Sequence, residues 1–200
     1  MSEFFSQQPL ILASGSLGRQ KLLRSLGVEF DVIPSDVNEE EIKCALKSVD
    51  FMELARHLAA AKAISVSKNH PDHFVIAADQ LCVLGKHYLD KPGNHATAIK
   101  HLCLLRGKTH QQIAACCIAK SGSIIWETQE IAALTMKNLS DKVIDAYLQL
   151  DKPYQSCGAY NYEGRAKWLF ERVIGSDCTI VGLPLIPLAQ ALENHGIVVF

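Results

Sequence analysis

Residues 9–26 read PLILASGSLGRQKLLRSL, and this stretch predicts a strand, a tight turn and a helix in succession. The apolar run Pro9–Ala13 has the length of a buried strand. The small residues 14–16 form the turn, and leucines then recur at helical spacing between positions 22 and 26. Gly27 ends the helix, because glycine is favoured just beyond a helix C-terminus. A strand that leads directly into a helix is the first building block of an α/β fold.

The rest of the chain continues this alternation. Strands are expected at Phe30–Ile33, Phe74–Ala78, 111–120, 124–135 and Trp168–Val173, and helices from Asp50 onward and at Ala96–Leu105, Ser140–Leu150 and Pro184–Asn194. Glu53 follows Asp50 at the spacing of a capping box, and Ser140 is the expected N-cap of its helix. The Ser-Gly-Ser sequence at 121–123 joins two strands as a hairpin, so the sheet should be mixed.

Composition narrows the class of protein. Hydrophobic residues make up 48% of the 200 residues and charged residues 20%, so one domain, or two lobes sharing a cleft, can bury a sizeable core. The formal net charge is -1, which gives no support for a nucleic-acid-binding surface. A local group of Lys and Arg could still hold a small anion.

The cysteines and the apolar runs indicate a soluble, cytoplasmic protein. The seven cysteines are odd in number and form no C-x-x-C pair, and several lie inside apolar runs. Reduced, mostly buried thiols are the better interpretation, and a zinc site is not expected. The polar N-terminus lacks a signal-peptide pattern, and no run approaches the roughly 18 apolar residues of a membrane span.

The turn after the first strand is a candidate anion site. A turn of small residues at the start of a helix leaves backbone N–H groups free, and those groups favour an anion. Ser14 and Ser16 add hydroxyl groups, and Arg19 adds a planar charged fork that suits phosphate. The alternative is an N-cap serine and a surface arginine. The sequence matches neither a Walker A motif nor G-x-G-x-x-G.

Two further residues stand out against apolar surroundings. Asp79 directly follows the expected strand Phe74–Ala78, where a carboxylate could serve metal or proton chemistry or could cap a turn. Lys62 falls on the apolar stripe of its helix, four residues after Leu58. A lysine there either extends its ammonium to solvent or has an anionic partner.

Three weaker candidates complete the set. The acidic stretch Asp36–Glu41 is expected in a loop, either as a solvated face or as a source of a magnesium ligand beside Asp79. Lys91, in an Asp-Lys-Pro turn, could hold phosphate or be solvated. Glu163 could accept hydrogen bonds from the edge of a base or cap a turn.

The order of these features resembles the Maf family of nucleotide pyrophosphatases. The matching segments are Leu10–Leu23, Ser35–Glu39, Ala61–Ala63, Ala77–Gln80, Lys91–Pro92, Leu105–His110, Gly158–Gly164 and Val181–Leu185. The similarity covers about Leu10 to His195, nearly the whole chain. It is specific because so many motifs occur in one order.

Within the family, the chain looks like the branch that acts on 7-methyl-GTP. The residues that carry this likeness are Gln80 after the aspartate, Glu163, and the segment Leu169–Arg172. A carboxylate at Glu163 suits a methylated guanine, because that base is cationic and offers N–H donors. The chain departs from the family at Leu17, Gly18 and Gln20, where Pro, Trp or Arg, and a second Arg are usual.

The resemblance implies a mixed sheet flanked by helices, like that of the Maf and ITPase folds, with two lobes around a deep cleft and a single domain over residues 1–200. It also implies hydrolysis of a nucleoside triphosphate to monophosphate and pyrophosphate with Mg²⁺ or Mn²⁺. The implied roles are these: Asp79 as general base, Glu39 and Asp79 as metal ligands, Ser14, Ser16, Arg19, Lys62 and Lys91 as phosphate-binding residues, and Gly18, Gln80 and Glu163 as determinants of the base.

Alternatives remain open at this point. Gly18 leaves dTTP or UTP as rival substrates. The family's link to septum formation allows a nucleotide-binding division regulator with little catalysis. Nucleic acid and membrane are not expected partners, and a homodimer is an expectation by analogy with the family.

Overall fold

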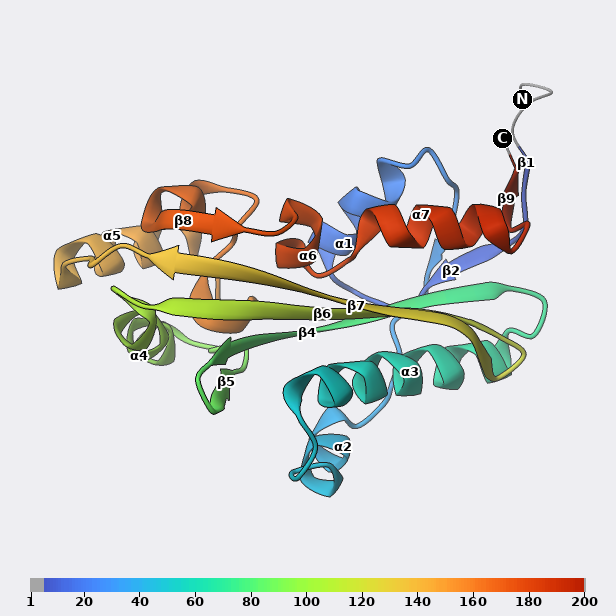
Figure 1. Cartoon of the computed structure of the whole chain (residues 1–200), viewed down its shortest axis with the longest axis horizontal. Helices are drawn as coiled ribbons and strands as arrows, with labels where there is room; N and C mark the ends of the chain where they lie inside the picture. Colours follow the sequence, from blue (N-terminus) through green and yellow to red (C-terminus); the bar gives the residue numbers. More distant parts are fainter. Residues whose placement is uncertain (1–5, 200) are drawn as a thin grey trace. The chain divides into compact units, whose positions relative to one another are not determined.

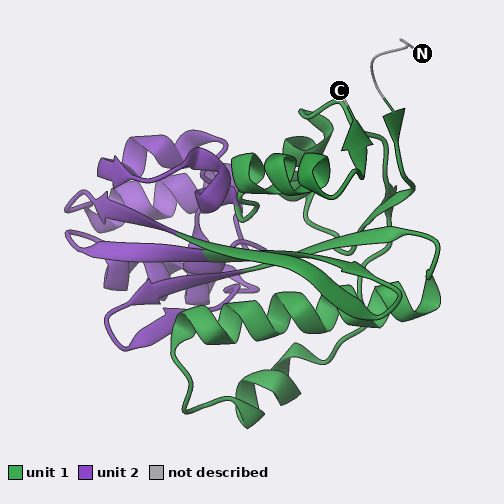
Figure 2. Ribbon diagram, turned by 45° about the vertical axis from the view of Figure 1, so that its right-hand side comes forward, with its two compact units in different colours: residues 1–79, 114–130, 182–200 green, residues 80–113, 131–181 purple. Residues whose placement is uncertain are grey.

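The computed structural model describes residues 6–199 and divides the chain into two compact units (Figure 2). Within the described residues, unit 1 consists of residues 6–79, 114–130 and 182–199, and unit 2 of Gln80–Ile113 and Ile131–Val181. The long strands β4 (Phe74–Leu84), β6 (Thr109–Lys120) and β7 (Ser123–Met136) contribute residues to both units. The chain passes from unit 1 to unit 2 within β4, directly after Asp79.

The main sheet is mixed, as expected. Among residues 6–199 its strand order is β3-β2-β4-β6-β7-β8, and β5 pairs with β4. Its shorter strands are β2 (Leu10–Leu12), β3 (Asp31–Val32), β5 (His87–Leu89) and β8 (Phe170–Ile174). Strand β2 pairs in parallel with β3 and β4, whereas the β4–β5 and β7–β8 pairs are antiparallel. A separate two-stranded sheet joins β1 (Ser6–Gln7) to β9 (Val198–Val199).

In unit 1, helices cover both faces of the sheet (Figure 1). Helices α1 (Leu17–Arg24) and α7 (Leu185–Asn194) lie on one face and α3 (Phe51–Asn69) on the other. The core packs Leu12 and Ile76 of the strands against Leu23 of α1 and Leu188 of α7. Helix α3 begins where its capping residues predict, because Asp50 accepts a hydrogen bond from the Glu53 N–H at 2.8 Å.

Unit 2 has its own apolar core, to which α4 and α5 both contribute. Its helices are α4 (His95–Leu105), α5 (Asp141–Asp151) and α6 (Asp177–Val181), with 3₁₀ segments η1 (Cys157–Ala159) and η2 (Arg165–Leu169). Leu102 of α4 and Leu148 of α5 are fully buried together with Leu134 of β7. Ser140 is the N-cap of α5, as expected, and accepts a hydrogen bond from the Val143 N–H.

The hairpin between β6 and β7 forms at the expected residues. Ser121 and Gly122 have φ values of 49° and 79°, the left-handed pair that a two-residue type I′ turn requires. The N–H of Gly122 donates to the Ser67 hydroxyl of α3 at 2.9 Å. The turn therefore fixes both the register of the hairpin and its contact with α3.

Several expectations about local structure were wrong. The strand that begins at Phe74 does not end at Asp79 but runs on to Leu84, because Leu81–Val83 are buried and Cys82–Leu84 pair with β5. The stretch expected as an acidic loop contains α2 (Glu39–Ala45), since Asn38 caps it by accepting a hydrogen bond from the Glu41 N–H. Trp168 and Leu169 lie in η2 rather than in a strand, and Trp168 is 79% exposed.

Other expectations are confirmed or stay predictions. All seven cysteines lie within the described residues and are free thiols. Three are buried, whereas the sequence predicted that most would be. No helix within residues 6–199 has the length and apolar character to cross a membrane. The expected deep cleft stays a prediction.

A buried polar network lies inside the core of unit 2. The Tyr160 hydroxyl accepts a hydrogen bond from Gln112 Nε2 at 2.7 Å and lies 2.8 Å from His110 Nε2. The rings of His110 and Tyr160 also pack against Phe170. Burial lowers the pKa of His110 to about 4, because the charged imidazolium would lose its hydration.

This network predicts loss of stability in acid. The ordinary pKa of His110 is 6.5 and its folded pKa is about 4, so folding favours the neutral ring. Its contribution is complete above pH 6.5 and is lost as the pH falls toward 4, since the unfolded chain then binds the extra proton. The free energy of unfolding should fall by about 3 kcal/mol across that window.

Urea unfolding at several pH values measures this change. His110→Gln, which cannot titrate, should flatten the pH dependence across the window. His87→Gln, at an exposed position in β5, is the control and should follow the wild-type curve. An unchanged slope in His110→Gln would contradict the assignment.

Candidate active site

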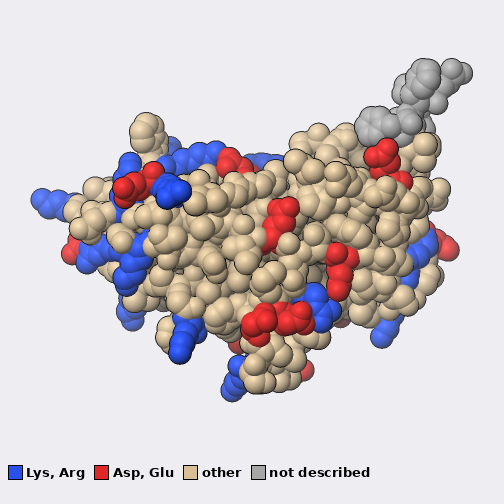
Figure 3. Space-filling model, in the orientation of Figure 1, with Lys and Arg blue, Asp and Glu red and all other residues tan. Residues whose placement is uncertain are grey.

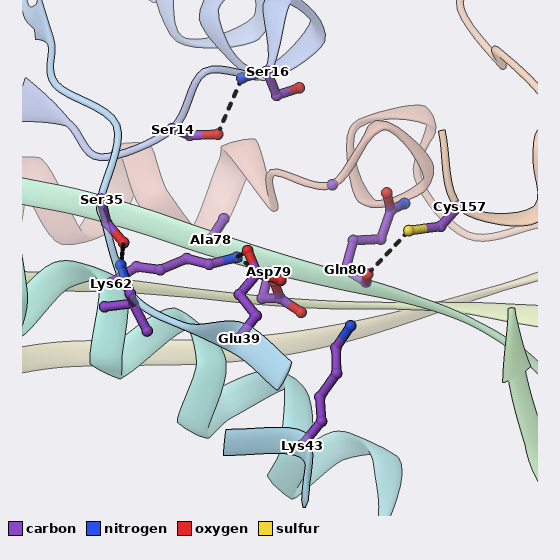
Figure 4. Close-up of polar contacts among 12 residues, drawn as sticks. Ser14, Ser16, Ser35, Glu39, Lys43, Lys62, Ala78, Asp79, Gln80 and Cys157 are labelled. Atoms are coloured by element: carbon purple, nitrogen blue, oxygen red, sulfur yellow. Dashed lines mark hydrogen bonds and ion pairs between the residues drawn. The ribbon is translucent and has the colours of Figure 1, made fainter. Parts of the chain in front are cut away.

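One lysine ammonium lies between two carboxylates in unit 1 (Figure 4). Lys62 Nζ donates to Asp79 Oδ1 at 2.6 Å and lies 2.9 Å from Glu39 Oε1. The side chains of Lys62 and Asp79 are 12% and 8% exposed, whereas that of Glu39 is 40% exposed. The cluster is thus buried on the lysine and aspartate side and open on the glutamate side.

Three different elements supply these residues. Lys62 extends from the apolar stripe of α3, Asp79 lies within β4, and Glu39 is the first residue of α2. Of the two alternatives for a lysine on an apolar stripe, the structure shows the one in which the ammonium has anionic partners. The prediction that a strand ends at Asp79 was wrong, because β4 continues to Leu84. Asp79, selected on that prediction, nevertheless belongs to this cluster.

Burial dominates the electrostatics of Asp79. It raises the pKa of this carboxyl, and the nearby charges of Lys62 and Arg19 act in the opposite direction. Glu39 adds a smaller upward effect on the same pKa. A buried carboxyl with a perturbed pKa and a specific cationic partner is typical of functional sites, although structural ion pairs produce the same pattern.

The turn after β2 is held by its own side chains. Ser16 caps α1 by accepting a hydrogen bond from the Arg19 N–H, and the Ser14 hydroxyl accepts one from the Ser16 N–H at 3.3 Å. The N-cap alternative is therefore correct for Ser16. Phosphate binding by Ser14 and Ser16 stays a prediction.

Arg19 is a clamp between backbone segments of unit 1. Its Nε donates to the carbonyl of Gly182 at 2.8 Å, and Nη1 donates to the carbonyl of Ala78 at 2.7 Å. Nη1 also lies 3.3 Å from the Ser14 hydroxyl. These contacts hold the turn after β2 against Ala78, the residue that precedes Asp79. Nη2 takes part in none of these three hydrogen bonds.

The departures from the family pattern lie on α1. Leu17 is exposed and Gly18 half-buried in the first turn of that helix. Gln20, where a second Arg is usual, is buried and accepts a hydrogen bond from Arg24 Nη2 at 3.2 Å. The side chain of Gln20 therefore stabilises the helix and adds no positive charge.

The remaining predicted residues belong to unit 2. The side-chain amide of Gln80 donates to the carbonyls of Thr179 and Ile180, and its backbone carbonyl accepts from Cys157 Sγ at 3.7 Å (Figure 4). Lys91 and Glu163 are both exposed. The roles assigned to these three residues stay predictions.

The charged side chains are unevenly distributed on the face in Figure 3, where basic ones are most numerous at the left-hand end and several acidic ones lie toward the middle. Within the described part of the chain, no group of three or more His, Cys, Asp or Glu side chains is arranged to hold a metal ion by itself. Any cation at the Lys62 cluster would thus depend on two carboxylates and on oxygens from a ligand.

Comparison with known proteins extends over nearly the whole chain. The family model described as "Maf-like protein" matches residues 9–195. A curated protein of Legionella pneumophila (strain Corby), named nucleoside triphosphate pyrophosphatase, is 57% identical over 99% of each chain. A protein of the same name from Bradyrhizobium diazoefficiens is 39% identical over 96% of each chain.

A HAM1 protein structure from Coxiella burnetii overlays on 66% of this chain and 74% of its own, with a TM-score of 0.40 and 15% identity. The likeness to that structure is too distant to support an inference.

The Arg19 clamp predicts a loss of stability in Arg19→Lys. Lysine keeps the charge but cannot donate to two carbonyls from a planar fork. We expect the free energy of unfolding to fall by about 2 kcal/mol in urea titrations. Arg24→Lys changes an exposed arginine of the same helix and should cost much less. Equal unfolding midpoints for Arg19→Lys and wild type would show that the clamp contributes nothing.

Proposed function

The chain belongs to the Maf-like protein family, and from that premise we propose that residues 1–200 act as one nucleoside triphosphate pyrophosphatase domain. The reaction releases a nucleoside monophosphate and pyrophosphate. Two curated relatives, at 57% and 39% identity, carry the name nucleoside triphosphate pyrophosphatase. The observation that supports it best is the buried Lys62–Asp79 pair, 2.6 Å apart, because hydrolysis of an anhydride needs a base and a cation at one point.

Asp79 is the proposed general base. Burial raises its pKa, which makes the carboxylate a better proton acceptor than an exposed aspartate. It takes a proton from a water molecule whose oxygen attacks the α-phosphorus. The bond from that phosphorus to the α–β bridging oxygen breaks, and the bridging oxygen leaves with pyrophosphate.

Lys62 has a double role in this proposal. Its ammonium has three donors, so it can keep its contact with Asp79 or Glu39 and still donate to a phosphate oxygen. When it moves toward phosphate, the Asp79 carboxylate becomes available to water. Ser14, Ser16, Arg19 and Lys91 are the other proposed phosphate-binding residues, with Nη2 of Arg19 as its proposed contact.

The carboxylates of Glu39 and Asp79 fit the divalent cation that the family implies. In the structure, Glu39 Oε1 and Asp79 Oδ1 both contact the ammonium of Lys62, at 2.9 Å and 2.6 Å from its Nζ. The two carboxylates can therefore hold positive charge at one point. Mg²⁺ is commonly held by one or two carboxylates together with substrate phosphates. When bound, Mg²⁺ or Mn²⁺ supplies positive charge to the phosphate oxygens.

The proposed substrate is 7-methyl-GTP, and Gln80, Glu163 and Gly18 are the proposed determinants of the base. The methylated guanine is cationic, so a carboxylate at Glu163 both accepts its N–H donors and offsets its charge. Glu163 is exposed and therefore accessible to a ligand. Gly18 offers no side chain to the base, which places more of the selectivity on Glu163 and Gln80.

Replacement of Asp79 tests the proposed reaction. In Asp79→Asn the Lys62–Glu39 ion pair remains, so nucleotide binding should be largely kept while kcat falls by about 10²–10⁴-fold. Pyrophosphate release is measured with Mg²⁺ and with Mn²⁺ on GTP, 7-methyl-GTP, dTTP, UTP and CTP. Asp31→Asn, at an exposed position in β3, is the control and should keep wild-type activity.

The possible outcomes separate the alternatives. Full activity in Asp79→Asn would remove Asp79 from the mechanism. A wild-type protein that binds nucleotides tightly but releases no pyrophosphate from any of them would favour the division regulator over the enzyme.

Glu163→Gln tests the choice of base. An amide lacks the negative charge that offsets a cationic base, and it offers a donor to the carbonyls of thymine and uracil. The ratio of kcat/KM for 7-methyl-GTP to that for dTTP should fall about tenfold or more. Glu193→Gln, at an exposed position in unit 1, should leave the ratio unchanged. An unchanged ratio in Glu163→Gln would show that this residue does not read the base.

A further inference from the structure

A carboxylate in unit 2 is buried at an unfavourable place. Asp151 is the last residue of α5, and its side chain is only 6% exposed. The C-terminus of a helix carries partial negative charge, so a carboxylate is disfavoured there, and burial adds the cost of its desolvation. Its ion-pair partner Arg165, at 2.7 Å, is 63% exposed. An ion pair with so exposed an arginine contributes little to stability, so the burial of Asp151 needs a further reason.

Helix α5 holds both ends of the segment 161–165. Tyr147 and Asp151 lie four positions apart and therefore share one face of the helix. The Tyr147 hydroxyl accepts a hydrogen bond from the Asn161 N–H at 2.9 Å, and Asp151 Oδ1 accepts one from Arg165 Nη1 at 2.7 Å. Burial raises the pKa of the Tyr147 hydroxyl, and a hydrogen bond to the Asp151 carboxylate raises it further. Since that hydroxyl gives its one proton to Asp151, its lone pairs face the Asn161 N–H.

Glu163 lies in the middle of this segment. Residues 162–164 form a turn, which is closed by a hydrogen bond from the Gly164 N–H to the Asn161 carbonyl at 3.1 Å. A β-carbon at Gly164 would lie 3.7 Å from Asp151 Oδ2, so the buried carboxylate packs against the turn itself. The side chain of Glu163 stays exposed. Contacts with α5 thus fix the backbone on either side of a glutamate that remains accessible to a ligand.

We propose that Asp151 is a positioning residue for recognition of the base, and that it acts by holding the segment 161–165 that carries Glu163. This inference rests on the proposed function, in which Glu163 reads the base. A loop residue loses conformational freedom when it binds a ligand, and a loop that is fixed beforehand lowers that entropic cost. The gain applies only to a base that Glu163 binds. Asp151 therefore acts on selectivity between bases and not on hydrolysis in general.

A double-mutant cycle separates this role from a structural one. Asp151→Asn keeps the size of the side chain and removes its charge. The ratio of kcat/KM for 7-methyl-GTP to that for dTTP should fall about fivefold in the wild-type background but less than about twofold in Glu163→Gln. A role in stability alone would change the two backgrounds alike. Asp141→Asn, which breaks an ion pair of an 84% exposed carboxylate at the other end of α5, is the matched control and should leave the ratio unchanged.

Amide hydrogen exchange tests the anchor in nucleotide-free protein. In Asp151→Asn the Tyr147 hydroxyl is no longer oriented by a carboxylate, so the Asn161 N–H should exchange at least about tenfold faster than in wild type. Asp141→Asn should keep the wild-type rate at Asn161. Because this measurement involves no reaction, it reports on the segment 161–165 even if the protein hydrolyses no nucleotide.

Three results would overturn the proposal. They are an unchanged ratio in folded Asp151→Asn, an equal fall of the ratio in both backgrounds, and an unchanged exchange rate at Asn161. If Asp151→Asn does not fold, Arg165→Gln takes its place, since an exposed arginine can be replaced at little cost in stability, and an unchanged ratio there would count against the proposal. Faster exchange at Asn161, together with a ratio that Glu163→Gln does not alter, would mean that the anchor exists and that the proposed reading of the base fails.

Discussion

The site depends on the ion pairs that the ammonium of Lys62 forms with Glu39 and Asp79. The ammonium forms ion pairs with both carboxylates, of which Asp79 is buried within β4 and could not remain there as an unpaired charge at low cost. Because the three residues come from α2, α3 and β4, their convergence also fixes how these elements meet. A triphosphate would exchange partners with this lysine and leave an aspartate with raised pKa beside the reacting phosphorus. The Lys62–Asp79 ion pair thus compensates a buried charge in unit 1 and also supplies the base and the cation of the proposed reaction.

Much of the fold could be predicted because local signals act over short distances. Asp50 and Ser140 cap the helices expected of them, and Ser121–Gly122 form the expected turn. Lys62 was identifiable because a charge on an apolar stripe needs a compensating partner. The position of Asp79 within its strand could not be predicted, since the continuation of β4 depends on burial of Cys82 in the core of unit 2 and on pairing with the distant strand β5. Helix α2 was missed because its polar sequence lacks an apolar stripe.

Part of the candidate site serves the fold as well as the proposed reaction. The sequence pattern predicts that Arg19 binds phosphate. In the structure, its Nε and Nη1 donate hydrogen bonds to the backbone carbonyls of Gly182 and Ala78. Carbonyls from distant segments leave no signature in the sequence, so this clamp could be found only in the structure. Local sequence thus identified the residue types, and packing determined which of their atoms remain available.

The central claim is that water attacks the α-phosphorus at the Lys62–Asp79 pair. Hydrolysis of the preferred triphosphate in ¹⁸O-labelled water, followed by mass spectrometry of both products, tests it most directly. The account predicts one ¹⁸O atom in the nucleoside monophosphate and none in pyrophosphate. Label in pyrophosphate, or release of labelled orthophosphate, would mean that another phosphorus is attacked and would contradict the proposed mechanism.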